Sequence, residues 1–235
     1  MERITAYKQK ADIGVNAFVR SVYNWMCMGL ALTGVVSWYV ANNDAIRNMI
    51  YGGGSAVFFI LIIAELGLVF AISGLISKMK GSTATALFVI YSALNGVTLS
   101  FIFIAYTATS IASTFFICAL TFLSCSIYGW TTKKDLTSIG SFMFMGLIGI
   151  IIASVVNMFI HSSAIYYAVS YIGVVVFVGL TAYDTQKIKN MALTQPAGLE
   201  GDVARKGAIL GALSLYLDFI NLFLMLLRIF GGSRD

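Results

Sequence analysis

Long apolar stretches alternate with short clusters of charged residues along almost the whole chain. A helix needs about 20 mostly apolar residues to cross the hydrocarbon core of a bilayer, and stretches of that length fit between the charged clusters. The pattern therefore predicts an all-α membrane protein with seven transmembrane helices. The predicted spans are residues 22–41, 56–77, 84–106, 110–131, 139–160, 164–185 and 207–229.

One polar segment divides the third predicted span from the fourth. Residues 83–131 contain no charged side chain, so charge marks no boundary there. The stretch is too long for one spanning helix, and only the polar sequence Tyr106-Thr-Ala-Thr-Ser110 offers a place for a break. We therefore expect the connection between the two spans in this polar sequence.

The composition excludes an ordinary soluble domain. Hydrophobic residues make up 59% of the chain and charged residues 11%, against roughly 45–50% and 25% in soluble domains. The mean hydropathy is +0.89. No long soluble insertion or low-complexity linker interrupts the spans, so we expect a single membrane domain over residues 1–235 with a short cytoplasmic N-terminal segment, residues 1–20.

The basic residues predict the orientation in the membrane. The net charge is +5, which in this chain reflects basic cytoplasmic loops rather than contact with nucleic acid. Twelve of the fifteen basic residues precede the first span or fall in alternate connections, which predicts a cytoplasmic N-terminus and an external C-terminus. The twelve are Arg3, Lys8, Lys10, Arg20, Lys78, Lys80, Lys133, Lys134, Lys187, Lys189, Arg205 and Lys206; the other three are Arg47, Arg228 and Arg234.

Three acidic residues lie within predicted spans, where a carboxylate costs roughly 2.5 to 3.5 kcal/mol at a helix centre. Glu65 is about 14 Å into the second span, and Asp218 is about 16 Å into the seventh, so both should face the interior of the bundle. Asp184 lies near the cytoplasmic end of the sixth span, about 8 Å shallower than Asp218, and contact between the two aspartates requires helix tilt.

Two carboxylates that meet in a medium of low dielectric constant cannot both ionise cheaply, and they titrate as a unit. Ionised, the Asp184 and Asp218 pair would repel itself and attract a cation; singly protonated, it would share one hydrogen bond and join two helices. These properties suit a proton sensor on a cation path. The simpler interpretation is that each acid is a structural hydrogen-bond partner for polar groups in the bundle.

Other polar residues at depth are expected to line a path or to satisfy these acids. Ser214 and Asn221 lie on the same helical face as Asp218, at i−4 and i+3. Hydrogen bonding between helices is the expected role of the remaining polar residues within spans. These are Asn95, Thr98, Thr121, Ser124 and Asn157.

Two segments around the aspartates form a specific pattern. The first is Gly173-Val-Val-Val-Phe-Val-Gly-Leu-Thr-Ala-Tyr-Asp-Thr-Gln-Lys187. The second runs from Gly211 to Gly231 and contains Leu215-Tyr-Leu-Asp-Phe-Ile-Asn-Leu-Phe223. They resemble the two diagnostic segments of the Bax inhibitor-1 family, and the resemblance covers the whole chain in length, span number and loop charge. The chain most resembles the short bacterial inner-membrane members of that family.

This resemblance implies a fold in which the last helix is central and surrounded by the other six, and a pH-dependent calcium leak. It implies that Asp184 and Asp218 form the proton-sensing pair and a weak, transient calcium site, and that Glu65 lies on the ion path. A bacterial member has a latch arginine near the end of the second helix, where this sequence has Ile76. Lys78 is the nearest candidate for that latch, although an ammonium does not reproduce a bidentate guanidinium.

Two other functions compete with a cation leak. One is a non-transporting regulator that binds membrane proteins such as a membrane-anchored protease, as some bacterial relatives are thought to do, through residues 1–20. The other is an intramembrane aspartyl protease, which is disfavoured because Asp218 lacks a glycine-flanked turn and Pro196-Ala-Gly precedes it. No phosphate loop, catalytic serine or cysteine constellation, or metal-ligand spacing is present, so we predict neither an enzyme nor a resident cofactor.

Overall fold

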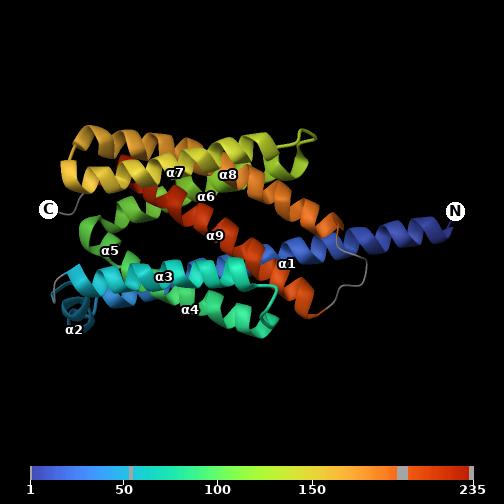
Figure 1. The fold of residues 1–235 in the computed structure, drawn as a ribbon, viewed down its shortest axis with the longest axis horizontal. Helices are drawn as coiled ribbons and strands as arrows, with labels where there is room; N and C mark the ends of the chain where they lie inside the picture. The colour runs from blue at the N-terminus through green and yellow to red at the C-terminus, as the bar shows by residue number, and fades with distance from the viewer. Residues whose placement is uncertain (1, 53–54, 195–200, 233–235) are drawn as a thin grey trace. The chain divides into compact units, whose positions relative to one another are not determined.

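The computed structural model describes residues 2–52, 55–194 and 201–232, without the side chains of residues 2–13 and Ser55. Within these ranges every regular element is helical, which confirms the prediction of an all-α protein (Figure 1). The elements are α1 Glu2–Ala41, α2 Asp44–Arg47, the π-helical turn η1 Asn48–Gly52, α3 Ser55–Leu75, α4 Gly81–Leu99, α5 Phe101–Ala105, α6 Ala108–Thr131, α7 Thr137–Ile160, α8 Ser163–Thr194 and α9 Asp202–Phe230.

Six of the described helical segments are long and apolar enough to cross a membrane. They correspond to the second to seventh predicted spans. The first predicted span, 22–41, lies within α1, which is not among the six, so the seven-span count stays a prediction. The backbone of the N-terminal segment is helical from Glu2 and continuous with that span, while Arg234 lies outside the described residues. The six segments are Ala56–Leu75, Gly81–Ala105, Ala108–Thr131, Thr137–Ile160, Ser163–Thr194 and Asp202–Phe230.

The predicted break between the third and fourth spans is confirmed. Helix α5 ends at Ala105 and α6 begins at Ala108. Thr107 caps α6, because its Oγ1 accepts a hydrogen bond from the Ser110 N–H at 3.2 Å. A threonine hydroxyl at this position satisfies one of the amide groups that have no partner in the first turn of a helix. The polar sequence therefore ends one helix and starts the next.

Helix α8 extends nine residues beyond the predicted end of the sixth span at residue 185. Asp184 is therefore ten residues, or about 15 Å, before the end of the helix. The prediction that Asp184 lies near the cytoplasmic boundary of the membrane stays a prediction, because a helix of 32 residues is longer than a span requires. The charged and polar residues from Thr185 to Lys189 suggested a boundary, yet Thr185, Gln186 and Ile188 are buried among neighbouring segments. Tertiary packing outweighed the local polarity.

Packing divides the chain into two compact units. The first comprises residues 1–105 and 190–216, and the second comprises residues 106–189 and 217–235. The division passes through α9, between Tyr216 and Leu217. The single membrane domain and the central position of the last helix stay predictions.

In the first unit, α4 lies beside α1 and also beside α3 (Figure 1). A glycine permits the close approach of α1 and α4, because a Cβ atom at Gly96 would lie 2.8 Å from the carbonyl oxygen of Thr33. Ser37 of α1 donates a hydrogen bond to the Gly96 carbonyl at 2.7 Å. Small residues and hydroxyl groups thus join these helices where lipid offers no hydrophobic driving force between them.

In the second unit, α6, α7 and α8 pack with the last part of α9. Phe219 of α9 contacts Phe115 and Phe122 of α6 edge to face, with ring centroids 5.5 and 5.4 Å apart. Gly129 of α6 lies against the backbone of Ala182 in α8, at a position where a Cβ atom would clash with the Ala182 carbonyl. These contacts fix the part of α8 that carries Asp184 and the part of α9 that carries Asp218.

Candidate functional site

Asp218 is the most deeply buried acidic residue of the site. It lies in α9, and only 5% of its surface is exposed. Its Oδ2 atom is buried and has no hydrogen-bond partner in the part of the chain that the structure describes. A buried carboxylate oxygen without a donor is costly. Such an atom in a native fold calls for a functional explanation.

Asp184 is the second carboxylate of this site. It lies in α8 and is half-buried, and its charge acts on Asp218. The fold thus brings the two aspartates near enough for their charges to interact, although no hydrogen bond joins their carboxyl groups among the described residues.

Lys187 is a third member of the site that the sequence analysis did not single out. Its positive charge acts on both Asp184 and Asp218, and it partly offsets the repulsion between the two carboxylates. Lys187 is exposed and follows Asp184 by three residues, a spacing that places both side chains on one helical face. That i, i+3 spacing was the signal that the sequence offered.

Glu65 lies in the first unit and has a different environment. It belongs to α3 and is half-buried against α4. Its Oε1 accepts a hydrogen bond from the Thr98 hydroxyl at 2.7 Å, and its Oε2 accepts one from the Asn95 side-chain amide at 3.3 Å. The expectation that Asn95 and Thr98 form hydrogen bonds between helices is confirmed.

The hydrogen bonds around Glu65 continue into α9 and α1. The Tyr216 hydroxyl donates to Asn95 Oδ1 at 3.0 Å and lies 2.6 Å from the Thr33 hydroxyl, which in turn donates to the Ser92 carbonyl at 2.8 Å. We call Glu65, Asn95, Thr98, Tyr216 and Thr33 the Glu65 network. Sequence reasoning missed Tyr216, although a tyrosine at depth generally needs a partner for its hydroxyl.

Ser214 and Asn221 flank Asp218 on α9. Ser214 is half-buried, and the Asn221 amide donates to the Leu217 carbonyl at 2.8 Å within its own helix. Asn221 also lines a cavity in the second unit. No group of three or more His, Cys, Asp or Glu residues in the described ranges could hold a metal ion.

Lys78, the candidate latch, lies in the turn after α3 and is exposed. Its side chain forms no ion pair with a carboxylate of the described residues. A latching role for Lys78 therefore stays a prediction.

Three of the polar residues within spans do not bond between helices as expected. Thr121 and Ser124 donate to carbonyl groups four residues earlier in α6. Asn157 accepts a hydrogen bond from the Ser162 N–H at the end of α7. Threonine and serine can satisfy their hydroxyl groups on the preceding turn, so a polar residue in a span need not face another helix.

Comparison with known proteins places the chain in a family. The family described as "Inhibitor of apoptosis-promoting Bax1" matches residues 15–235. The inner membrane protein YbhL of Escherichia coli K12 is 54% identical over 222 residues, which cover 94% of each chain. An uncharacterised protein of Borreliella burgdorferi is 48% identical over 99% of this chain and 98% of its own length. An uncharacterised membrane protein of Streptococcus pyogenes serotype M6 is 40% identical over 95% and 96%.

The chain belongs to the Bax inhibitor-1 family, and it is a multi-pass membrane protein. Its similarity to YbhL supports a location in the inner membrane, while the sides on which its termini lie stay predictions. The name of YbhL describes an inner membrane protein, and neither that name nor the description of the family mentions a catalytic activity.

Proposed function

We propose that this protein is a pH-dependent cation leak in which Asp184 and Asp218 form the proton-sensitive gate. The observation that carries the proposal is the buried Asp218 oxygen without a hydrogen-bond partner, close enough to Asp184 for the two charges to interact. When both carboxyl groups are ionised, they attract a cation; when one is protonated, the attraction weakens and a shared hydrogen bond becomes available.

Calcium is the expected ion. Ca²⁺ prefers oxygen ligands and takes six to eight of them in a storage site. Two carboxylates supply only a few, which suits a weak and transient site through which an ion passes rather than one where it stays. Ser214 and Asn221 add polar groups on the same face of α9 as Asp218.

Glu65 is proposed as a further acid on the ion path. It lies ten residues after the start of α3, or about 15 Å along the helix, and its side chain is only partly buried. An acidic residue at that depth in a membrane is a functional candidate by default. Its two hydrogen bonds hold the carboxylate in place and leave the remaining lone pairs for an ion.

Calcium flux into proteoliposomes, measured from acidic to neutral pH, tests the gate. We expect wild-type flux to depend on pH and Asp218→Asn to remove that dependence, because asparagine cannot change its charge. Asp44→Asn is the matched control, since Asp44 is exposed and pairs with Arg47 outside the long helices. Unchanged pH dependence in Asp218→Asn would refute the proposed gate.

The alternative function is a regulator that binds membrane proteins such as a membrane-anchored protease. It requires a surface that contacts the partner. Its proposed contact is the segment 1–20, of which residues 1–13 have no described side chains. Deleting residues 2–20 should abolish complex formation on the regulator hypothesis and leave flux intact on the leak hypothesis. Both measurements on the same deletion separate the two functions.

A further inference from the structure

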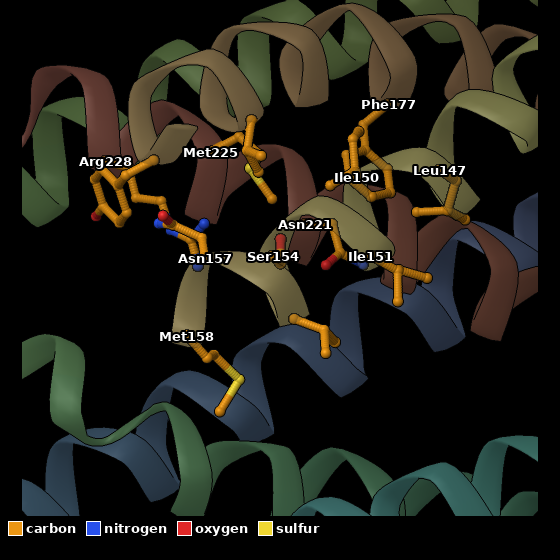
Figure 2. A pocket seen from close by; sticks show the side chains of 13 residues that line it. Leu147, Ile150, Ile151, Ser154, Asn157, Met158, Phe177, Asn221, Met225 and Arg228 are labelled. Carbon is orange, nitrogen blue, oxygen red and sulfur yellow. The ribbon is translucent and has the colours of Figure 1, made fainter. Parts of the chain in front are cut away.

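A cavity of about 500 Å³ lies within the second unit (Figure 2). Residues of α7, α8 and α9 line it, and its walls are mainly apolar. Its volume falls within the range of sites that bind small organic molecules, roughly 300 to 1,000 Å³. Three of its α7 residues, Ile151, Val155 and Met158, are at least half exposed on the molecular surface. These exposed side chains leave one side of the cavity open, wide enough in principle for a lipid acyl chain to enter.

The two ends of the cavity differ in polarity. Leu147 and Ile150 of α7 and Phe177 of α8 form the apolar end, whereas Asn157 and Arg228 lie at the other end (Figure 2). Ten residues of α7, or about 15 Å, separate Leu147 from Asn157. The cavity is thus an apolar channel with one charged end.

The charged end lies where two spans end. Asn157 is three residues before the last residue of α7, and Arg228 is two residues before the last residue of α9. The apolar end is near the middle of α7. A cavity with this arrangement has its charge at the level of the membrane surface and its apolar walls at the level of the hydrocarbon core.

Arg228 has no anionic partner in the described part of the chain, where neither of the ion pairs involves it. Its guanidinium lies over the ring of Tyr166, 5.2 Å from the ring centroid. This contact orients the group and leaves its N–H donors for another partner. A guanidinium binds phosphate well, because its planar fork can donate two parallel hydrogen bonds.

We propose that this cavity binds one phospholipid with an anionic headgroup. Its phosphate binds Arg228, and an acyl chain lies along the apolar walls toward Leu147. A free anion would use the arginine but not the apolar walls. A calcium ion is disfavoured, because the one charged residue that lines the cavity is a cation. The proposal does not depend on the leak function, which resides in Asp184 and Asp218.

Native mass spectrometry of the full chain in mild detergent tests the proposal. Phosphatidylglycerol and phosphatidylcholine with the same acyl chains are titrated in parallel. We expect one phosphatidylglycerol to bind at least tenfold more tightly than phosphatidylcholine. Arg228→Gln should weaken the binding of phosphatidylglycerol about tenfold, or by about 1.4 kcal/mol. Arg228→Lys should retain part of it. Arg47→Gln is the matched control, because Arg47 already pairs with Asp44 at 2.6 Å.

A second variant separates the apolar walls from the charge. Val155→Trp places a large side chain at the exposed rim, and we expect it to weaken phosphatidylglycerol binding without lowering the melting temperature. A phosphatidylglycerol with a photoreactive acyl chain should label α7 between Leu147 and Met158. Equal binding of the two lipids, equal binding to Arg228→Gln, or displacement of the lipid by inorganic phosphate would each overturn the proposal.

Discussion

Glu65 and Asp218 are both acidic residues deep within membrane-spanning helices, yet the two units of the protein surround them differently. Both oxygens of Glu65 accept hydrogen bonds, and the network continues through Asn95 and Tyr216 to Thr33. Asp218 is more deeply buried, and one of its oxygens has no partner among the described residues. The charged groups that act on Asp218 are the Asp184 carboxylate and the exposed Lys187 ammonium.

This difference separates two kinds of buried acid: one that stabilises the fold through hydrogen bonds, and one that can change its state by binding a proton or a cation. When both oxygens of a buried carboxylate accept hydrogen bonds, those bonds stabilise the fold. Removing the carboxylate leaves the donor groups without a partner. A carboxylate that faces another negative charge and lacks donors gains most from a change in its own state, either by binding a proton or by binding a cation.

The largest effect should come from the coupled pair. Asp184→Asn, Asp218→Asn and the double variant are compared by calcium flux against pH in proteoliposomes. If the carboxylates act as a unit, each single variant removes most of the pH dependence and the double variant adds little, because coupling makes the effects non-additive. Losses that simply add in the double variant would show that the two aspartates act separately.

Two substitutions of Glu65 separate the contribution of its charge to stability from that of its hydrogen bonds. Glu65→Leu leaves Asn95 and Thr98 without their acceptor, and we expect it to lower the free energy of unfolding by about 1 to 3 kcal/mol. Glu65→Gln keeps the shape: its amide oxygen can accept from Asn95, and its amide nitrogen can donate to the Thr98 hydroxyl, so its stability should remain near that of the wild type. Thermal unfolding in detergent measures both. A Glu65→Gln protein as unstable as Glu65→Leu would mean that the charge itself stabilises the fold.

Tyr216→Phe should have a smaller effect on stability, about 1 kcal/mol, because it removes the hydroxyl that joins Asn95 to Thr33 and keeps the ring. The ring contacts with Phe88 and Tyr91 should persist. Tyr91→Phe is the control, since the Tyr91 hydroxyl forms no hydrogen bond with the described residues. Equal melting temperatures for Tyr216→Phe and Tyr91→Phe would argue against a role of the network in stability.

Lys187→Met should shift the pH midpoint of flux upward by roughly half a unit. Loss of the positive charge disfavours ionised Asp184 and Asp218, and an exposed ion pair contributes at most about 1 kcal/mol, where 1.36 kcal/mol corresponds to one pH unit. Lys189→Met is the control, because Lys189 donates to the Trp130 carbonyl at 2.6 Å. A downward shift in Lys187→Met would contradict this assignment.

The smallest effect should come from Asp135, an exposed acid between α6 and α7. Hydrogen bonds from the Thr137 side chain and backbone lower the pKa of Asp135 below its ordinary value of 3.8. A lowered pKa in the folded state stabilises the protein above the ordinary value, and the contribution is lost as the pH falls through the folded value. Asp135→Ala should therefore lower the melting temperature slightly at neutral pH, with a difference that disappears in acid. A difference that grows in acid would contradict the sign.

Several features of the fold followed from local sequence. The polar residues at 106–110 predicted the break that Thr107 caps, and Asn95 and Thr98 were expected to bond between helices. The same expectation was wrong for Thr121 and Ser124, because a hydroxyl can donate a hydrogen bond to a carbonyl of its own helix as easily as to another helix. Helix α8 continues nine residues beyond the predicted end of its span, because polar residues after Asp184 are buried by packing that local sequence does not reveal.

The sequence by itself determined that this protein is a helical membrane protein with acids at depth, because the cost of exposing backbone and charge to lipid restricts the chain to long apolar helices. Only the tertiary structure decided which groups those acids meet. Hydrogen bonds act over about 3 Å and charge interactions weaken with distance, so the hydrogen bond from Thr98 to Glu65 and the charge interaction between Asp184 and Asp218 depend on how separate helices pack. The same packing formed the cavity beside Arg228, which no local pattern predicted.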